Sequence, residues 1–285
     1  MIDILQFKAS DSCNQYEELL HYTSFEVLKI ILGNRTLKLN SIKNLNDKAE
    51  QNRKGIEELA KGFYIASFCH YPYEIVPFWF MYGKCENDKK VLLRFRNFSL
   101  NIDSAIENDS AWTSDNKILY YDPCKLFRTN IGGISCNPIN DPTVEGRQTI
   151  ETIRLFDIDY RLPNDEVFTK NYSSSEGVSF DGGNTFIETP IKDVSSVGRY
   201  KTINWEYEAE TRLQCRMSTL IPPLFDYILI KLNDEIFREL KIVANPWASE
   251  EFIQQIQNTV ELCSLSDDIR QSISIVRSEL DGQIA

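Results

Sequence analysis

The segment ELLHYTSFEVLKIILGNRTLKLNSI, residues 18–42, constrains the fold more than any other stretch, because its apolar pattern changes period along its length. In SFEVLKIILGN the apolar residues recur near the spacing of a helix face, with Thr23 or Ser24 placed as the N-cap and Gly33-Asn34 as the C-cap. TLKLNSI instead alternates apolar and polar residues, as a half-buried strand does. The chain is therefore expected to open with a strand, a helix and a second strand.

Further strands are expected along the rest of the chain, in the segments GFYIASFCH, KKVLLRFR, KILYYDP, RYKTINWEYEAETRLQC, DYILIKL and ELKIVANP. Residues 137–196 are rich in turn-forming residues and predict an irregular insertion, in which TVEGRQTIETIRLFDIDYRL leaves room for a helix. The end of the chain predicts a helical C-terminal segment over residues 248–285. Together these elements predict a single α+β domain spanning residues 1–285.

Composition limits the partners of such a domain. The chain has 31 basic and 42 acidic residues and a net charge of -11. This charge opposes non-specific binding to a long polyanion, where summed Lys and Arg contacts supply the affinity. A local basic groove for a small and specific nucleic-acid substrate stays open.

Cysteine, histidine and apolar content bear on location and metals. Seven scattered cysteines without a C-x-x-C pair are typical of reduced thiols, and with only two histidines we expect no metal site. The sequence contains no run of about 18 apolar residues, so we expect no membrane-spanning helix. The start of the chain lacks the basic flank and apolar core of a secretory signal, so a cytoplasmic location without membrane contact is expected.

The line WEYEAETR, residues 205–212, is the most unusual in the sequence. If it is one strand, its period of two places Glu206, Glu208 and Glu210 on one face and Trp205 with Tyr207 in the core. Neighbouring carboxylates repel unless that face meets water or a cation. Taken alone, the pattern is most simply the wet face of an edge strand, and a lone histidine such as His21 is most simply structural.

Several motifs taken in order resemble the ADP-ribosyltransferase superfamily. LLHYTSFEVLKIIL, IASFC and WEYEAETR are similar to its opening strand ending in His-x-Thr or His-x-Ser, its mid-chain serine strand and its late [Gln/Glu]-x-Glu strand. More narrowly, the chain resembles a bacterial domain family of poorly known function through HYTS, LNDxxE at residues 45–50, W-x-x-Y-G at 79–83 and W-x-x-E-x-E-x-R at 205–212. The resemblance spans most of the chain. It implies a split β-sandwich of two small sheets with NAD cleaved in the cleft between them.

The resemblance also implies roles for the acidic pair and the first histidine. Glu210 matches the catalytic glutamate, and Glu208 would hold or polarise the acceptor. Glu206 with Glu208 also satisfies the E-x-E pattern, so the register between the two acids stays open. His21 resembles the histidine that contacts the ribose of NAD.

The remaining site residues follow from the same resemblance. The backbone at Tyr22 would hold the nicotinamide amide, and Thr23 would support the turn after it. Ser67 resembles the strand serine that lines the nicotinamide pocket. Trp79 and Tyr82 would supply aromatic walls, although ordinary core packing explains them equally well.

The implied chemistry suits this residue set. Cleavage between ribose C1′ and the cationic nicotinamide creates an oxocarbenium-like centre that a carboxylate stabilises, and the leaving group departs neutral without a general acid. The resemblance thus implies an NAD-dependent transferase acting on an intracellular macromolecule, either protein or nucleic acid, although a small-molecule acceptor fits the sequence as well. It further implies a bacterial toxin or phage-defence effector restrained by an antitoxin or another partner, with the segment after Ala248 as one docking surface.

Two alternatives stay open beside this enzyme. The first is a catalytically inactive module of the same fold that senses a nucleotide or binds a protein. The second is a cysteine nucleophile, Cys69 with His21, because Cys69 and His70 are adjacent on a strand and point to opposite faces. No G-x-G-x-x-G after a strand, P-loop, H-E-x-x-H or G-x-S-x-G supports a dehydrogenase, kinase, metalloprotease or α/β-hydrolase.

Overall fold

The computed structural model describes residues 16–45, 47, 50, 62–82, 89–96, 106–113, 118–119, 150–169, 178–179, 185–186, 197–217 and 226–284. Within these ranges the protein is a mixed α+β structure with an eleven-stranded sheet, two two-stranded sheets and a few helices. Parts of LNDxxE and of KILYYDP, and Gly83 of W-x-x-Y-G, lie outside the described residues. In the described part, no helix has the length and apolar character that crossing a membrane requires.

The predicted opening unit is confirmed as β1 (Leu19–Ser24), α1 (Phe25–Asn34) and β2 (Thr36–Ser41). Ser24 is the N-cap, since its hydroxyl accepts a hydrogen bond from the Val27 amide at 3.3 Å. The predicted C-cap is off by one residue, because Arg35 and not Gly33-Asn34 takes the left-handed conformation, with φ 57°. The buried helix face consists of Phe25, Leu28, Ile31 and Leu32.

The central strand β3 (Phe63–Cys69) joins the two halves of the large sheet. Along one edge it pairs with β12 (Glu210–Met217), from Cys69 opposite Glu210 to Phe63 opposite Arg216. Its other edge is shared, because Cys69 pairs with Leu20 of β1 while Ile65 and Tyr64 pair with β2. The strands β1 and β2 therefore part along β3, and this parting positions the site described below.

The strands beyond this junction form two arms. Next to β1 lie β4 (Lys90–Phe95), β14 (Lys241–Ala244) and β15 (Ser274–Arg277), and next to β2 lie β13 (Tyr227–Leu232), β5 (Ile106–Thr113) and β6 (Ile118–Leu119). The main core follows β1, β2, β4, β13 and β14 and extends under the helices. Each of the six further segments expected as strands therefore contains a strand over at least part of its length.

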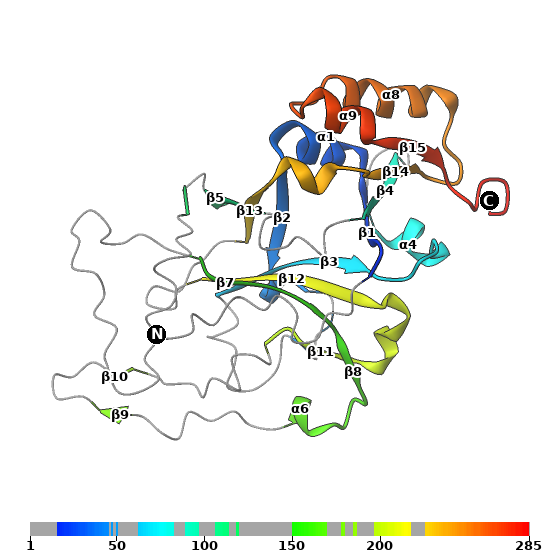
Figure 1. Ribbon diagram of the computed structural model, residues 1–285. Helices are drawn as coiled ribbons and strands as arrows, with labels where there is room; N and C mark the ends of the chain where they lie inside the picture. The colour runs from blue at the N-terminus through cyan, green and yellow to red at the C-terminus, as the bar shows by residue number, and fades with distance from the viewer. Residues whose placement is uncertain are drawn as a thin grey trace.

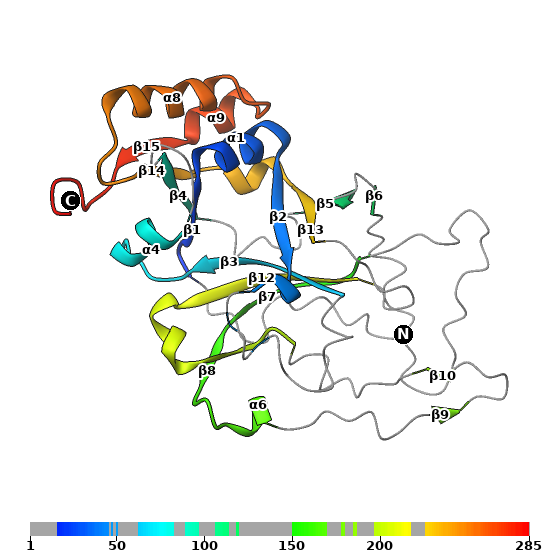
Figure 2. The same ribbon diagram turned by 180° about the vertical axis from the view of Figure 1, so that it is seen from behind.

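The helices α1, α8 (Glu250–Glu261) and α9 (Asp267–Ser272) gather at one end of the molecule, away from β12 (Figures 1 and 2). The Ser249 hydroxyl caps α8 by accepting from the Phe252 amide at 3.2 Å, and the Phe252 ring packs edge-on against Phe25 of α1. The expected helical C-terminal segment is present as α8 and α9, but it also contains β15, which follows α9 and pairs in parallel with β14.

The predicted insertion at residues 137–196 is also wrong over part of its length. Instead of a helix, TVEGRQTIETIRLFDIDYRL contains β7 (Ile150–Asp157) and β8 (Asp159–Arg161). β-Branched and aromatic residues favour a strand here, and β12 offers an edge with which β7 pairs antiparallel from Thr211 to Met217. The pairing supplies backbone hydrogen bonds that the sequence pattern alone does not reveal.

Short elements complete the described chain. They are η1 (Ile42–Asn44), α4 (Val76–Met81), α6 (Glu166–Thr169), β9 (Val178–Ser179), β10 (Thr185–Phe186), β11 (Tyr200–Thr202), η3 (Ile203–Glu208) and η4 (Asp234–Phe237). β11 runs parallel to β8 and leads directly into η3. β11 contributes Lys201 to the site described below, and η3 contributes Trp205 and Glu208.

Candidate active site

A cavity of about 340 Å³ lies where β1 and β2 part along β3. Its walls come from β1, β2, β3, α4, η3 and β12, segments far apart in the sequence. Six of the eight predicted site residues line it: His21, Tyr22, Ser67, Tyr82, Glu208 and Glu210. Its volume lies in the range of small-molecule sites, about 300–1,000 Å³.

The other two predicted residues, Thr23 and Trp79, do not line the cavity. Thr23 is buried in β1, where it pairs with Val91 of β4. Trp79 is 1% exposed, and its indole N–H donates to Glu74 at 3.0 Å. The Trp79 ring packs edge-on against Tyr22 at 5.1 Å, so Trp79 supports a wall residue from behind.

His21 bridges the gap between β1 and β3. Its Nδ1 lies 3.0 Å from the carbonyl oxygen of Ser67, and only a protonated Nδ1 can donate to that oxygen. Burial lowers the pKa of His21, and the hydrogen bond to Ser67 only partly offsets this effect. The imidazole is therefore neutral at pH 7, and its Nε2 can accept a hydrogen bond from a ligand hydroxyl.

The expectation that residues 205–212 form one strand is wrong. Trp205 and Glu208 belong to η3, Ala209 is left-handed with φ 41° and ψ 54°, and β12 begins only at Glu210. Glu206 is exposed as predicted, but the predicted burial is reversed at Glu208, Glu210 and Tyr207. Glu208 and Glu210 are 5% and 3% exposed, whereas Tyr207 is 41% exposed.

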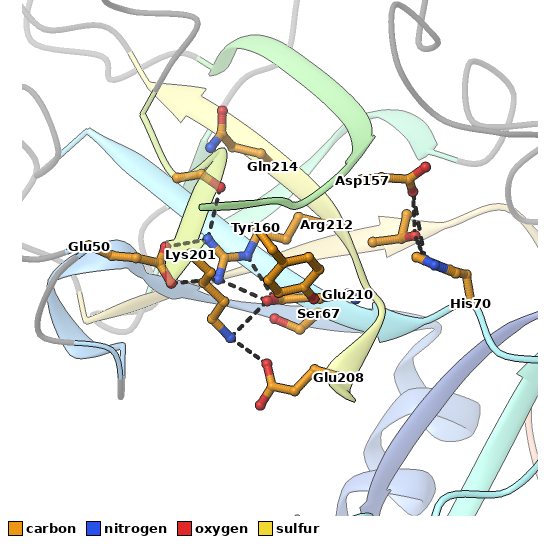
Figure 3. A network of polar contacts seen from close by, with 12 residues as sticks. Glu50, Ser67, His70, Asp157, Tyr160, Lys201, Glu208, Glu210, Arg212 and Gln214 are labelled. Atoms are coloured by element: carbon orange, nitrogen blue, oxygen red, sulfur yellow. Dashed lines mark hydrogen bonds and ion pairs between the residues drawn. The ribbon is translucent and has the colours of Figure 1, made fainter. Parts of the chain in front are cut away.

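Glu210 is held by two cations. Arg212 contacts both of its carboxylate oxygens, with Nε–Oε1 at 2.6 Å and Nη2–Oε2 at 3.0 Å, and the Lys201 ammonium lies 2.9 Å from Oε2 (Figure 3). Burial alone would raise the pKa of Glu210, but the charges of Arg212 and Lys201 outweigh it and lower the pKa to about 2. Glu210 is consequently a carboxylate throughout the physiological pH range.

Glu208 receives two different donors. The Tyr82 hydroxyl donates to Oε1, and the Lys201 ammonium donates to Oε2. Burial, together with the Glu208 charge, raises the pKa of the Tyr82 hydroxyl far above its ordinary value, so Tyr82 remains a donor at every physiological pH. The two glutamates therefore share one ammonium. Glu208 also accepts from Tyr82, and Glu210 is also hydrogen-bonded to Arg212 and to the Ser67 side chain.

Arg212 is anchored from behind by Glu50, the last residue of LNDxxE. Its Nη1 and Nη2 lie 2.5 Å and 2.9 Å from the two Glu50 oxygens, and Nη1 also donates to the Gly198 carbonyl at 2.8 Å. Arg212 thus pairs with Glu50 and Glu210 at the same time. Burial raises the pKa of Glu50 despite the guanidinium, so Glu50 takes up a proton before Glu210 does.

Sequence reasoning gave no role to Lys201 or Glu50. Glu50 had a signal in the LNDxxE motif, whereas Lys201 stands in RYKT, where no motif distinguishes it. Both side chains are buried, and both line the cavity. Glu50 contacts Arg212 across a separation of 162 residues, whereas Lys201 contacts Glu208 across only 7.

The surroundings of Cys69 do not favour the cysteine nucleophile. Burial raises the pKa of the Cys69 thiol to about 12, so a thiolate does not form near neutral pH. The histidines are engaged elsewhere, His21 with Ser67 and His70 with Thr211 at 3.0 Å. In the region that the structure describes, no group of three or more His, Cys, Asp or Glu side chains could hold a metal ion.

Comparisons with known proteins give no match: no family model fits the chain, and neither a curated protein nor a solved structure is significantly similar to it.

Proposed function

We propose that the protein is an NAD-dependent ADP-ribosyltransferase with a split β-sandwich fold. One observation carries the proposal: a single cavity collects His21, Ser67, Glu208 and Glu210. The resemblance in sequence selects the same four residues for the cleavage of NAD. The parting of β1 and β2 along β3 supports the proposed split of the sheet.

In the proposed reaction the bond between ribose C1′ and the nicotinamide nitrogen breaks, and its electron pair leaves with neutral nicotinamide. The ionised Glu210 lies in a buried setting, where a fixed negative charge stabilises a developing oxocarbenium centre more than it would in water. Neutral His21 accepts a hydrogen bond from a ribose hydroxyl. A lone pair of the acceptor then forms the new bond to C1′, and the proton of the acceptor passes to Glu208.

The acceptor is an intracellular macromolecule, either protein or nucleic acid. The net charge of -11 favours a protein or a short, specific nucleic-acid segment over a long polyanion. In this proposal the protein acts in the cytoplasm as a toxin or phage-defence effector, and an antitoxin or another partner restrains it. Expression of the wild type should then slow growth, and Glu210→Gln or His21→Ala should restore it.

The direct test measures nicotinamide released from NAD by the purified protein, with cell extract supplied as acceptor. Glu210→Gln should reduce the release by about 10²-fold or more, the usual consequence of losing one electrostatic stabiliser of a transition state. Glu206→Gln is the matched control, because Glu206 is an exposed acid of η3 only four residues away. An inert wild type, or equal rates for wild type and Glu210→Gln, would refute the proposal.

A second candidate is a catalytically inactive module that senses a nucleotide or binds a protein partner. The observation that favours it is the saturation of Glu210, whose two oxygens already accept from Arg212 and Lys201. Calorimetry separates the candidates. A sensing module binds NAD without releasing nicotinamide, whereas the transferase does both.

A further inference from the structure

Lys201 occupies the centre of the charged wall of the cavity. It extends from β11, its side chain is 10% exposed, and its ammonium contacts Glu208 as well as Glu210. The ammonium also lies over the Trp205 ring, 5.1 Å from its centroid. All four residues line the cavity, and Figure 3 shows the lysine reaching between the two acids.

The other donors at this wall are divided between the acids. Arg212 donates hydrogen bonds to Glu210 and also pairs with Glu50, while the Tyr82 hydroxyl donates to Glu208. Lys201 is the donor that Glu208 and Glu210 have in common. Without it, two buried carboxylates would stand side by side with no cation between them, an arrangement that drives one of them to take up a proton.

We propose that Lys201 is a positioning residue of this site: its ammonium bridges Glu208 and Glu210 and holds the two carboxyl groups together facing the cavity. The inference rests on the proposed function for its catalytic consequence, because a protonated Glu210 could not stabilise a cationic centre. If the bridge is correct, Lys201 sets the pH below which the rate of NAD cleavage falls. The bridge itself can be measured without turnover.

Several titratable or charged groups face this cluster from the elements packed around it. They are Glu50 between β2 and β3, Cys69 on β3, Tyr82 directly after α4, Tyr160 on β8, Tyr207 and Glu208 on η3, and Glu210 and Arg212 on β12. Burial raises the pKa values of Cys69, Tyr82, Tyr160 and Tyr207, which keeps all four neutral near pH 7. The charge balance therefore depends on the carboxylates, Arg212 and Lys201.

The test replaces Lys201 with methionine, which keeps an unbranched side chain and removes the charge. The carboxyl carbon of Glu210 is followed by NMR in protein labelled with ¹³C-glutamate, with Glu210→Gln used to assign the signal. In Lys201→Met the pKa of Glu210 should rise by about one pH unit or more, the usual effect of removing an adjacent opposite charge. Lys201→Arg, which keeps the charge, should leave the titration of Glu210 close to that of the wild type.

An unchanged Glu210 titration in Lys201→Met would overturn the inference, whether or not the protein cleaves NAD. If Lys201→Met does not fold, as judged by circular dichroism, Lys201→Gln is measured in its place and the same criterion applies. The rate of nicotinamide release is then recorded against pH. Its acid limb should move upward with the Glu210 pKa in Lys201→Met, whereas loss of a merely structural residue would lower the rate equally at every pH.

The two proposals can fail separately. A wild type that releases no nicotinamide, combined with a raised Glu210 pKa in Lys201→Met, refutes the transferase and supports the bridge. An active wild type whose Glu210 titration and acid limb do not respond to Lys201→Met supports the transferase and refutes the bridge.

Discussion

Replacing Arg212 with methionine should strongly destabilise the protein, and the size of the effect follows from the carboxylates that it leaves behind. The Arg212 and Glu50 side chains are 1% and 2% exposed. Removing one partner of a buried ion pair costs about 3–5 kcal/mol, because the remaining charge is left uncompensated. Arg212→Met removes the guanidinium that pairs with two buried carboxylates, those of Glu50 and Glu210.

The pKa of Glu210 gives an independent measure of the same effect. It falls from an ordinary 4.5 to about 2 in the folded protein, through Arg212 and Lys201 acting against burial. At about 1.4 kcal/mol per pH unit, this difference corresponds to about 3 kcal/mol of stability at pH 7. Arg212 supplies the larger of the two favourable charge effects, so Arg212→Met should lie within the range of about 3–5 kcal/mol.

A double-mutant cycle with Glu50→Leu makes the prediction sharper. In the wild type Glu50→Leu should lower the free energy of unfolding, because it removes a bidentate partner of Arg212. In the Arg212→Met background the same change should raise it, because it deletes a buried carboxylate that has lost its counter-charge. The assay is urea unfolding at pH 7, followed by tryptophan fluorescence for the wild type, both single variants and the double variant.

The reasoning is refuted if Glu50→Leu changes the stability by the same amount in both backgrounds, within about 0.5 kcal/mol. It is equally refuted if Arg212→Met costs less than about 1 kcal/mol, the value of an exposed pair. As a control, Arg238→Met removes an exposed pairing with Glu235 and should be close to neutral.

Two further predictions concern stability. Because the pKa of Glu210 is depressed in the folded state, its contribution is present above pH 4.5 and lost as the pH falls toward about 2. Acid unfolding of Glu210→Gln should therefore lack this part of the pH dependence, and identical curves for variant and wild type would contradict the assignment. Glu74→Ala should lower the free energy of unfolding in urea by about 1–3 kcal/mol. It removes the carboxylate that accepts hydrogen bonds from the buried Trp79 N–H and from the Glu279 amide. A loss no larger than that of the exposed Glu251→Ala would argue against this role.

The local parts of the fold could be predicted from the sequence because their causes are local. The helix of residues 25–34 has its apolar spacing and its Ser24 cap within one segment, and the alternation of TLKLNSI specifies β2. The six predicted residues that line the cavity were likewise selected by short motifs. Their catalytic roles remain predictions.

The parts that could not be predicted depend on distant partners. β7 forms a strand where the sequence left room for a helix, because β12 provides its pairing edge about 60 residues later in the chain. Glu50 and Arg212 meet across 162 residues. Thr23 and Trp79 match the motifs but lie in the core. Thr23 pairs with β4 in the sheet, and Trp79 donates a hydrogen bond to Glu74.

The break between Glu208 and Glu210 is the least predictable feature, and it explains the site best. WEYEAETR contains neither glycine nor proline, yet Ala209 takes a left-handed conformation, which costs a non-glycine residue about 1–2 kcal/mol. Such a conformation persists only where surrounding contacts over-determine it.

Those contacts are present on both sides of Ala209. Its amide donates to the Glu206 carbonyl at 3.0 Å, and its carbonyl accepts from the His70 amide at 3.0 Å. In one continuous strand, the two acids would project side by side from a common face, held apart by the strand rise of about 3.3 Å per residue. The turn at Ala209 instead ends η3 and starts β12, so that Glu208 and Glu210 approach one ammonium from two different elements. Pairing of the acids is therefore a property of this turn and of Lys201, and the strain at Ala209 is the structural cost of that pairing.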